Sequence, residues 1–293
     1  MPLLGQDLPR SLSHRIAILG PGLIGGSLAM ALRSGGNFSA VSLWARRPEA
    51  VREVEKLLPG CAASTDLAAA VANCSIVILC LPPDSIISVG LTLNNLLPAD
   101  CIVTDAGSVK RTIVDQLESA LGGRFVGSHP MAGSEKNGLS AASPALFDGA
   151  ACILTPTPAT DPAALDTVRA LWREAGCRLV EMPPDAHDRA IARVSHLPHA
   201  AAASLILASL SADPSIAELA GGGLRDSTRI ASGPAPMWTE ILLENASEVA
   251  TGIADLQTRL AELKLALESG NRPAIEAFLS GARTLRANLQ SEP

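Results

Sequence analysis

The chain reads Arg15-Ile16-Ala17-Ile18-Leu19-Gly20-Pro21-Gly22-Leu23-Ile24-Gly25-Gly26 and then continues into the apolar stretch Ser27 to Leu32. The first apolar run predicts a strand, and the stretch after the glycines predicts a helix. Gly20 permits a tight turn, Gly22 lets backbone amides approach an anion, and Gly25 allows the helix to pack closely on the strand. The helix N-terminus would then face a pyrophosphate. This pattern therefore predicts a dinucleotide cradle that places five residues at the cofactor: Gly20, Gly22, Leu23, Ile24 and Gly25.

Composition limits the kind of protein that this chain can be. Its 293 residues are 47% hydrophobic, enough for two domains that each have a buried core. The net charge is −6 and only 2% of residues are aromatic, so the basic surface and stacking residues of a nucleic-acid binder are missing. We therefore expect small-molecule ligands and no metal site.

The cysteines and the apolar runs indicate a compartment. Cysteines occur at positions 61, 74, 80, 101, 152 and 177, mostly in apolar runs and without a C-x-x-C pair, as expected of reduced core thiols. The first fifteen residues lack the apolar segment of a signal peptide, and the run from Ala200 to Leu210 is too short to cross a bilayer. These features predict a cytoplasmic protein without a membrane partner.

Strand-like runs recur in the N-terminal half of the chain. They lie at residues 16–19, 41–44, 76–81, 101–104, 124–126, 151–154 and 178–181. Helical stretches such as 49–58, 67–72 and 109–121 separate many of them. This alternation predicts an α/β domain of Rossmann type, with a doubly wound and mostly parallel sheet, over residues 1–182. The pair Pro183-Pro184 marks the expected boundary.

Residues 183–293 are predicted to form a second, all-helical domain. The run from Ala200 to Leu210 is apolar on every side, which implies cover by neighbouring helices or by a second subunit. Farther along, a stripe of apolar side chains repeats at spacings of four and three: Val249, Ile253, Leu256, Leu260, Leu263 and Leu267. The stripe fits an ordinary bundle core or a dimer seam. Gly270 is expected to end this helix, and Pro273 to begin the last one.

The end of the second predicted strand bears on the choice of cofactor. An acidic residue there would bind the adenosine ribose 2′-hydroxyl, but the chain reads Trp44-Ala45-Arg46-Arg47. With no carboxylate at Ala45 and two adjacent guanidiniums, the pattern favours NADP, whose 2′-phosphate the arginines could bind. In the alternative, both arginines lie in a solvated turn and NAD binds without its usual acid. Leu81 ends the third strand-like run and Pro82 follows it, and these two residues complete the predicted cofactor site.

Two loops after strands are candidates for the chemistry, because open α/β sheets bind ligands beyond the carboxyl ends of their strands. The first is Asp105-Ala106-Gly107-Ser108-Val109-Lys110, in which Ser108 also fits the commoner role of a helix N-cap. The second spans residues 127–138, where His129 could act as a general base beside a nicotinamide. Taken alone, a histidine at such a position is more often structural.

Six motifs occur in order between about residue 15 and residue 250. They are 20–27, 105–110, 127–138, Val194-Ser195-His196-Leu197-Pro198-His199-Ala200, 221–231, and the segment from Met237-Trp238 to Leu243-Glu244-Asn245. Together they resemble the prephenate and arogenate dehydrogenases of tyrosine biosynthesis. The resemblance implies a nucleotide-binding domain followed by a helical dimerisation domain, and hence a homodimer. It also implies oxidative decarboxylation of prephenate or arogenate with hydride transfer to NADP or NAD, giving 4-hydroxyphenylpyruvate or tyrosine.

The resemblance implies a role for each matching residue. His129 becomes the neutral base that receives the proton of the substrate ring hydroxyl, and Ser108 the serine that orients this histidine or the hydroxyl. Arg229 becomes the arginine that binds a substrate carboxylate.

Further matches lie around that arginine. Glu135 matches an acid that joins Arg229 in an ionic network, and Asp226, three residues before Arg229, is within its reach if the segment is helical. Without the resemblance these three would indicate a surface salt-bridge cluster. His199 matches a substrate-contacting position, whereas His196 is expected to be structural.

Several alternatives stay open. Asp188 or Glu135 could meet either a keto group or an ammonium on the substrate side chain, so the choice between prephenate and arogenate is not decided. We expect the catalytic core alone, with no chorismate mutase segment before residue 15 and no appended regulatory domain. A β-hydroxyacid dehydrogenase or an imine reductase would share the cradle and the helical domain, but usually has a lysine or aspartate at its centre. A non-catalytic redox sensor would explain the glycines but would not need Ser108, His129 and Arg229.

Overall fold

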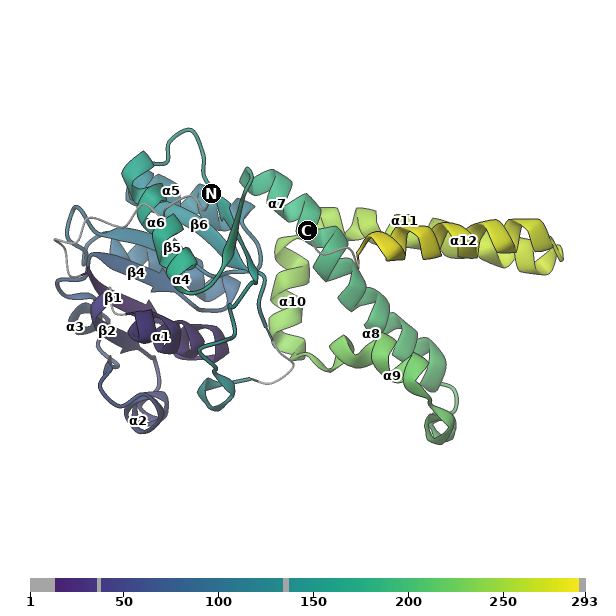
Figure 1. Cartoon of the computed structure of the whole chain (residues 1–293), viewed down its shortest axis with the longest axis horizontal. Coiled ribbons are helices and arrows are strands. Elements are labelled where there is room, and N and C mark those ends of the chain that lie inside the picture. The colour runs from purple at the N-terminus through teal and green to yellow at the C-terminus, as the bar shows by residue number, and fades with distance from the viewer. Residues whose placement is uncertain (1–13, 36–37, 134–136, 290–293) are drawn as a thin grey trace, which may run out of the picture.

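The computed structural model describes residues 14–35, 38–133 and 137–289, which form an α/β domain joined to a helical arm (Figure 1). Its sheet has eight strands in the order β3-β2-β1-β4-β5-β6-β7-β8. The strands are β1 (His14–Leu19), β2 (Phe38–Trp44), β3 (Ala62–Ser64), β4 (Ile76–Leu79), β5 (Ile102–Asp105), β6 (Phe125–Pro130), β7 (Ala151–Thr155) and β8 (Arg178–Glu181). All neighbours are parallel except β6 and β7, which are antiparallel. The prediction of a doubly wound, mostly parallel sheet is confirmed.

One strand was missing from the sequence prediction. β3 has three residues and pairs with β2 at the edge of the sheet, and none of its residues is buried. A strand this short, without an apolar run, leaves no periodic signal that separates it from a loop.

Helices cover both faces of the sheet. They are α1 (Leu23–Gly35), α2 (Pro48–Leu57), α3 (Leu67–Val71), α4 (Pro83–Leu93), α5 (Arg111–Leu121) and α6 (Pro162–Glu174). Along β1, Ile16 and Ile18 join the core under α1, α2 and α6, whereas Ala17 and Leu19 join the core under α3, α4 and α5. Because both faces are buried, the central strands β1 and β4 contain continuous apolar runs, Ile16 to Leu19 and Ile76 to Leu79, rather than alternating ones.

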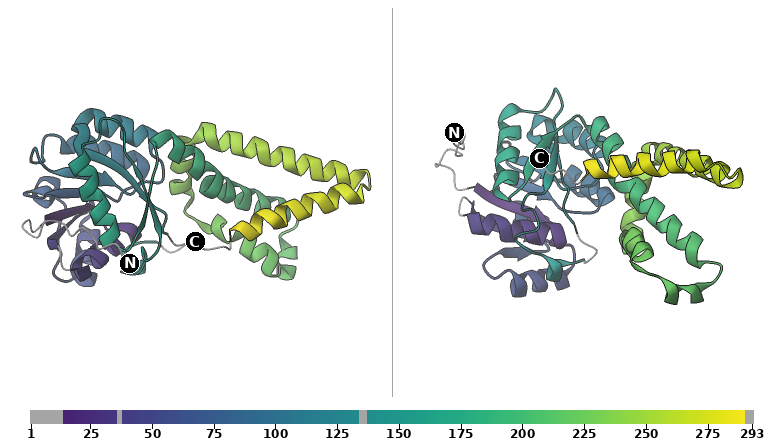
Figure 2. Two further views of the ribbon diagram at one scale, coloured as in Figure 1. Left: turned by 45° about the horizontal axis from the view of Figure 1, so that its top comes forward. Right: turned by 45° about the vertical axis from the view of Figure 1, so that its right-hand side comes forward.

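The chain beyond β8 is helical, as predicted. It comprises α7 (Pro184–Ile191), a π-helical turn (Ala192–His196), α8 (Leu197–Leu210), a 3₁₀ segment (Pro214–Leu219), α9 (Gly222–Thr228), a 3₁₀ turn (Arg229–Ser232), α10 (Ala235–Glu244), α11 (Ala246–Glu268) and α12 (Arg272–Asn288). Gly270, with a φ of 63°, lies between the last two helices. These two helices run side by side and project away from the sheet (Figures 1 and 2). Within the described ranges, no helix is long and apolar enough to cross a membrane.

The apolar stripe on α11 divides between two environments. Val249 is buried and Leu256 and Leu263 are half-buried within the chain, but Ile253, Leu260 and Leu267 are 37%, 56% and 60% exposed. On α8, Leu205 and Leu207 are likewise exposed. One chain therefore leaves part of these helices uncovered, as a dimer seam would.

All six cysteines are free thiols, and five of them are buried. This agrees with the prediction of reduced core cysteines.

Candidate active site

Three adjoining cavities follow the carboxyl ends of the strands. The first, of about 390 Å³, is lined by Gly20 and Arg46 among others, and we call it the arginine-end cavity. The middle cavity, of about 350 Å³, shares Gly22 and Leu81 with it. The interdomain cavity, of about 370 Å³, lies between the α/β domain and the helical arm. Because His129 and Ser108 line both the middle and the interdomain cavities, the three form a continuous path.

The glycine turn at the first two cavities has the geometry of a dinucleotide cradle. Gly20 has a φ of 104°, and a Cβ on it would clash with the carbonyl oxygen of Cys80. A Cβ on Gly25 would clash with the carbonyl oxygen of Gly20, whereas a Cβ on Gly22 would meet nothing within 4 Å. Gly20 and Gly25 thus pack against the protein, whereas space is left beside Gly22, which lines the first two cavities. These residues fit a bound pyrophosphate at the N-terminus of α1.

The predicted cofactor residues gather at this path. Residues that line the arginine-end or middle cavity include Gly20, Gly22, Leu23, Ile24, Ala45, Arg46, Arg47, Leu81 and Pro82. Gly25 lies beneath the turn instead, where it allows the close packing described above. Arg46 and Arg47 are exposed and immediately precede α2, and Glu53 of that helix lines the same cavity. The sequence prediction did not include this carboxylate.

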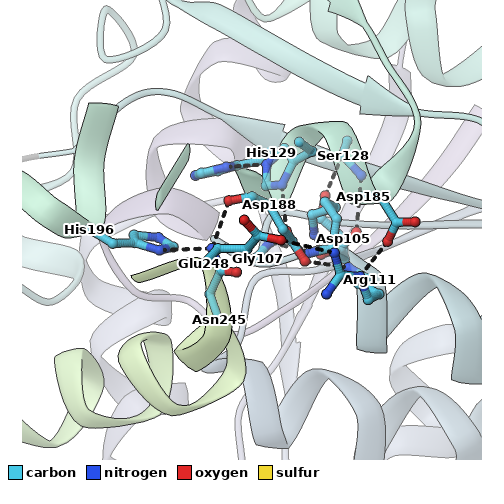
Figure 3. Close-up of polar contacts among 12 residues, drawn as sticks. Asp105, Gly107, Arg111, Ser128, His129, Asp185, Asp188, His196, Asn245 and Glu248 are labelled. Carbon is cyan, nitrogen blue, oxygen red and sulfur yellow. Dashed lines mark hydrogen bonds and ion pairs between the residues drawn. The ribbon is translucent and has the colours of Figure 1, made fainter. Parts of the chain in front are cut away.

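His129 lies at the end of β6 and is only 8% exposed. Its Nδ1 atom is 2.9 Å from Nε2 of His187, and Nδ1 of His187 is 2.8 Å from Oδ1 of Asp188. The Asp188 carboxylate accepts the backbone N–H groups of Lys110 and Arg111, at 2.8 and 2.9 Å. Figure 3 shows His129 and Asp188 within this cluster. A chain of side chains therefore connects His129 to the start of α5.

Burial keeps the histidines of the cluster neutral. It lowers the pKa of His129 well below the usual 6.5, and the neighbouring His187 and Lys110 lower it further. Burial also lowers the pKa of His187, although Asp188 opposes the shift. At Asp188, burial raises the pKa, but hydrogen bonds from His187 and from the two backbone N–H groups outweigh it, so the net pKa is lowered. The cluster thus combines neutral imidazoles with an ionised carboxylate.

A second buried pair holds the loop that carries Ser108. Lys110 forms an ion pair with Asp105, and both side chains are fully buried. The same carboxylate accepts the backbone N–H groups of Gly107 and Ser128, at 2.9 and 3.0 Å. Ser108 itself is half-buried and faces the two cavities beside His129. The N-cap position of α5 belongs to Lys110, so the N-cap interpretation of Ser108 is wrong.

The helical arm supplies the far wall of the interdomain cavity. Arg229 lines it from the 3₁₀ turn and is the one formally charged side chain among its described lining residues. His196 also lines it, although the sequence predicted a structural role. Asn245 Nδ2 lies 3.2 Å from Nδ1 of His196 and donates to the backbone carbonyl of Asp188 at 2.8 Å (Figure 3). Burial lowers the pKa of His196 to about 4, so this ring is neutral.

Other predicted substrate residues lie elsewhere. His199 is 6% exposed and stacks on Trp238, with ring centroids 3.5 Å apart, while it is Trp238 that lines the cavity. Asp226 is exposed on α9 and is not among the residues lining the described cavities. Glu135 lies outside the described residues. Asp188 does not contact these cavities, because it is 2% exposed and bound to His187 and to backbone amides, so its proposed contact with the substrate side chain is wrong.

Sequence reasoning gave no role to three residues of the site: His187, Trp238 and Asn245. His187 and Asn245 reach His129 and His196 from 58 and 49 positions away in the chain. No local spacing connects them. The adjacent pair His187-Asp188 at the start of the helical arm was the available signal, since a buried histidine next to a carboxylate is a common way to set the state of an imidazole.

Family comparisons agree with this geometry. The model described as "Prephenate dehydrogenase, nucleotide-binding domain" matches residues 28–181, and "Prephenate dehydrogenase, dimerization domain" matches residues 183–281. The chain belongs to the prephenate dehydrogenase family. Membership makes it an oxidoreductase and confirms the resemblance that the motifs indicated.

Individual relatives cover nearly the whole chain. A cyclohexadienyl dehydrogenase of Zymomonas mobilis is 34% identical over 87% of this chain and 88% of its own length. The crystal structure of prephenate dehydrogenase from A. aeolicus in complex with hydroxyphenyl propionate and NAD+ has a TM-score of 0.89 and 33% identity, over 96% of this chain and all of that one. An arogenate dehydrogenase of Synechocystis has a TM-score of 0.80 and 29% identity, over 94% and 99% of the two chains. The family fold, a nucleotide-binding domain followed by a helical dimerization domain, is therefore confirmed.

Proposed function

We propose that this protein oxidises and decarboxylates prephenate, arogenate or both, with NADP or NAD as the hydride acceptor. The observation that carries the proposal is the position of His129. It is a buried, neutral imidazole at the junction of a cavity lined by a dinucleotide cradle and a cavity lined by Arg229. A base between a cofactor and an anion-binding arginine suits the oxidation of a hydroxyl group on an anionic substrate.

Each residue has a defined task in this reaction. The free ring nitrogen of His129 takes the proton of the ring hydroxyl, and Ser108 holds that hydroxyl or the ring that receives its proton. Arg229 binds a substrate carboxylate through two parallel hydrogen bonds. When bound, the nicotinamide supplies the acceptor for the hydride that leaves the hydroxyl-bearing carbon. The ring carboxylate is then lost as carbon dioxide, and its bonding electrons complete the aromatic ring.

We propose NADP as the preferred cofactor. Ala45 offers no carboxylate, and Arg46 and Arg47 line the arginine-end cavity just before α2. Pro48 has no N–H, and the N–H groups of Ala50 and Val51 donate to the carbonyl of Arg47, so the two guanidiniums are the groups that favour a phosphate there. Glu53 in the same cavity and the NAD+ in the A. aeolicus complex favour the alternative, NAD.

We also propose that the protein acts as a homodimer in the cytoplasm. The matched dimerization domain and the exposed apolar side chains of α8 and α11 support a dimer. Six unpaired thiols suit a reducing compartment.

One assay tests the proposed function. Purified protein is given prephenate and arogenate in turn, each with NADP and with NAD, and the absorbance of the reduced cofactor is followed together with release of carbon dioxide. We expect reduced cofactor and carbon dioxide in equal amounts with at least one acid. Absence of reduction with either acid would contradict the proposal and leave a related dehydrogenase or a dinucleotide sensor.

A further inference from the structure

One ring nitrogen of His129 is within hydrogen-bonding distance of another buried histidine. The Nδ1 atom of His129 lies 2.9 Å from Nε2 of His187, whose own Nδ1 lies 2.8 Å from the Asp188 carboxylate. His187 is fully buried and Asp188 is 2% exposed. We propose that His187 and Asp188 are positioning residues that fix the tautomer of His129, so that its Nε2 atom always presents a lone pair to the reacting hydroxyl. This inference rests on the proposed role of His129 as the base.

The direction of each hydrogen bond between His129, His187 and Asp188 follows from the acceptor at the far end, the Asp188 carboxylate. An ionised carboxylate only accepts, so Nδ1 of His187 must carry the proton that is donated to Asp188. In a neutral ring the other nitrogen is then an acceptor. Nε2 of His187 therefore accepts, and Nδ1 of His129 must be the donor. The remaining nitrogen of His129, Nε2, is left unprotonated, which is the form that a general base needs.

Asp188 stays ionised and in place because the backbone holds it. Its Oδ1 atom accepts the N–H of Lys110 as well as the His187 proton, and Oδ2 accepts the N–H of Arg111. These amides begin α5, directly after the loop that carries Ser108. The same contacts thus connect the tautomer of His129 to the loop that presents the serine.

Neither His187 nor Asp188 is a substrate ligand. The described residues that line the three cavities include His129 and Ser108 but not these two. A purely structural role for a buried polar pair would need only satisfied hydrogen bonds, whereas this pair directs the donor hydrogen of a ring that borders the reaction cavity. Its loss should therefore lower kcat more than it raises either KM.

The charged groups around His129, His187 and Asp188 favour the same tautomer of His129. Lys110 faces both His129 and His187 but is paired with Asp105, and His196 on the helical arm is neutral because its pKa is about 4. Asp188 is the remaining carboxylate that contacts the His187 ring. When His129 takes up a proton, its Nδ1–H still donates to His187, and the nearby carboxylate stabilises the positive charge.

Variants of His187 separate positioning from packing. His187→Leu removes the acceptor and should lower kcat roughly 10- to 100-fold, less than the 10² to 10⁴ that a general base contributes. His187→Gln places an amide oxygen near the former Nε2 position and should restore most of the lost kcat. KM for substrate and cofactor should change less than about threefold in both. A His187→Gln variant as impaired as His187→Leu, or wild-type kcat in His187→Leu, would overturn the inference.

A second pair of variants tests the carboxylate. The amide of Asp188→Asn can donate to Nδ1 of His187 and so favours the wrong tautomer of His129, which should lower kcat. The acidic limb of the pH profile of kcat should also shift to lower pH, because protonated His129 loses the negative charge that stabilises it. The matched control is Asp185→Asn, on the same helix, whose exposed carboxylate pairs with Arg111. The control should retain wild-type kcat and pH profile. An Asp188→Asn pH profile equal to that of the control would contradict a positioning role for Asp188.

The tautomer itself can be observed without turnover. Long-range proton–nitrogen correlation spectra of protein labelled with ¹⁵N in its five histidines distinguish protonated from unprotonated ring nitrogens. We expect both His129 and His187 to carry hydrogen on Nδ1, with signals assigned by His129→Gln and His187→Gln. Hydrogen on Nε2 of His129 would overturn the inference whatever the activity. Failure of the proposed function can be told apart from failure of this inference. It would appear as a wild-type protein that is inactive on prephenate and arogenate although its His129 has the expected tautomer.

Discussion

His129 can serve as a base only while its ring is neutral, and its surroundings ensure this. Burial is the main cause that lowers its pKa well below 6.5, and the neighbouring rings and Lys110 act in the same direction. A base is lost as the pH falls through its pKa, so a lowered pKa extends activity toward acid. We expect kcat/KM to stay level from about pH 8 down through the usual histidine range and to fall only below it.

The same residue gives a mutational prediction. His129→Asn should lower kcat roughly 10²- to 10⁴-fold and leave the affinity for the cofactor nearly unchanged, because it removes the base but not the cradle. Steady-state rates and cofactor titration measure the two effects. Unchanged turnover would remove His129 from the reaction, and a midpoint of the acidic limb near 6.5 would contradict the lowered pKa.

Arg229 is predicted to act in binding rather than in chemistry. It is the charged described residue of the interdomain cavity, and loss of a charge-assisted pair with a carboxylate should raise the substrate KM roughly 10- to 100-fold in Arg229→Ala. Arg225→Ala is the matched control, because Arg225 is exposed on α9 and donates to a backbone carbonyl. Equal KM values in the two variants, or a change confined to thermal stability, would favour a surface role for Arg229.

At the scale of elements, the site is assembled where strands end and helices begin. The turn between β1 and α1 forms the cradle, the approach to α2 carries two arginines, and the loop from β5 to α5 carries Ser108. Parallel strands bring these segments to one edge of the sheet, although they are far apart in the sequence. The antiparallel strand β7 pairs with residues 127–130 of β6, with His129 opposite Ile153, and so fixes the backbone that carries the proposed base.

The start of α2 gives a prediction about the cofactor. The double variant Arg46→Ser, Arg47→Ser should raise the KM for NADP roughly 10- to 100-fold and leave that for NAD within about twofold, since only the 2′-phosphate is bound by these guanidiniums. Arg52→Ser, on the exposed side of the same helix and paired with Glu49, is the control. A wild-type enzyme that prefers NAD would contradict the assignment of NADP.

At the scale of the whole molecule, the helical arm presents more apolar surface than one chain covers. Ile253, Leu260 and Leu267 recur every seven residues along one face of α11 and are each more than one-third exposed. Helices that project from the sheet with such a face are suited to packing against a second copy. The other half of the stripe packs within the chain as a bundle core, and we propose the exposed half as the dimer seam.

Charge placed on that face should separate the subunits. Leu260→Glu is expected to convert the dimer to a monomer by light scattering coupled to size exclusion, because burying a carboxylate in an apolar seam is costly. Thr258→Glu, on the opposite side of α11, should remain dimeric. A Leu260→Glu protein with the same mass as the control would place the seam elsewhere.

The local sequence determined the elements with strong periodicity and the turn with special backbone needs. Glycines at 20, 22 and 25 have roles that depend only on the absence of a side chain, so their spacing along the chain is enough to assign them. The apolar runs of β1 and β4 are continuous because both sheet faces are buried, so they too were evident. The short edge strand β3 was not, because three partly exposed residues carry no period.

Only the tertiary structure decided the partners of the proposed catalytic side chains. The motifs singled out His129 and Ser108, but His187, Asp188 and Asn245 reach the site across a domain junction. Burial and hydrogen bonds, rather than spacing, set the protonation of His187 and Asp188. The sequence left open a contact between Asp188 and the substrate side chain, whereas in the fold Asp188 is buried and bound to His187. Periodicity and backbone freedom are properties of neighbouring residues and can be read along the chain. Hydrogen-bond direction and pKa depend on what surrounds a group in space, which only the fold supplies.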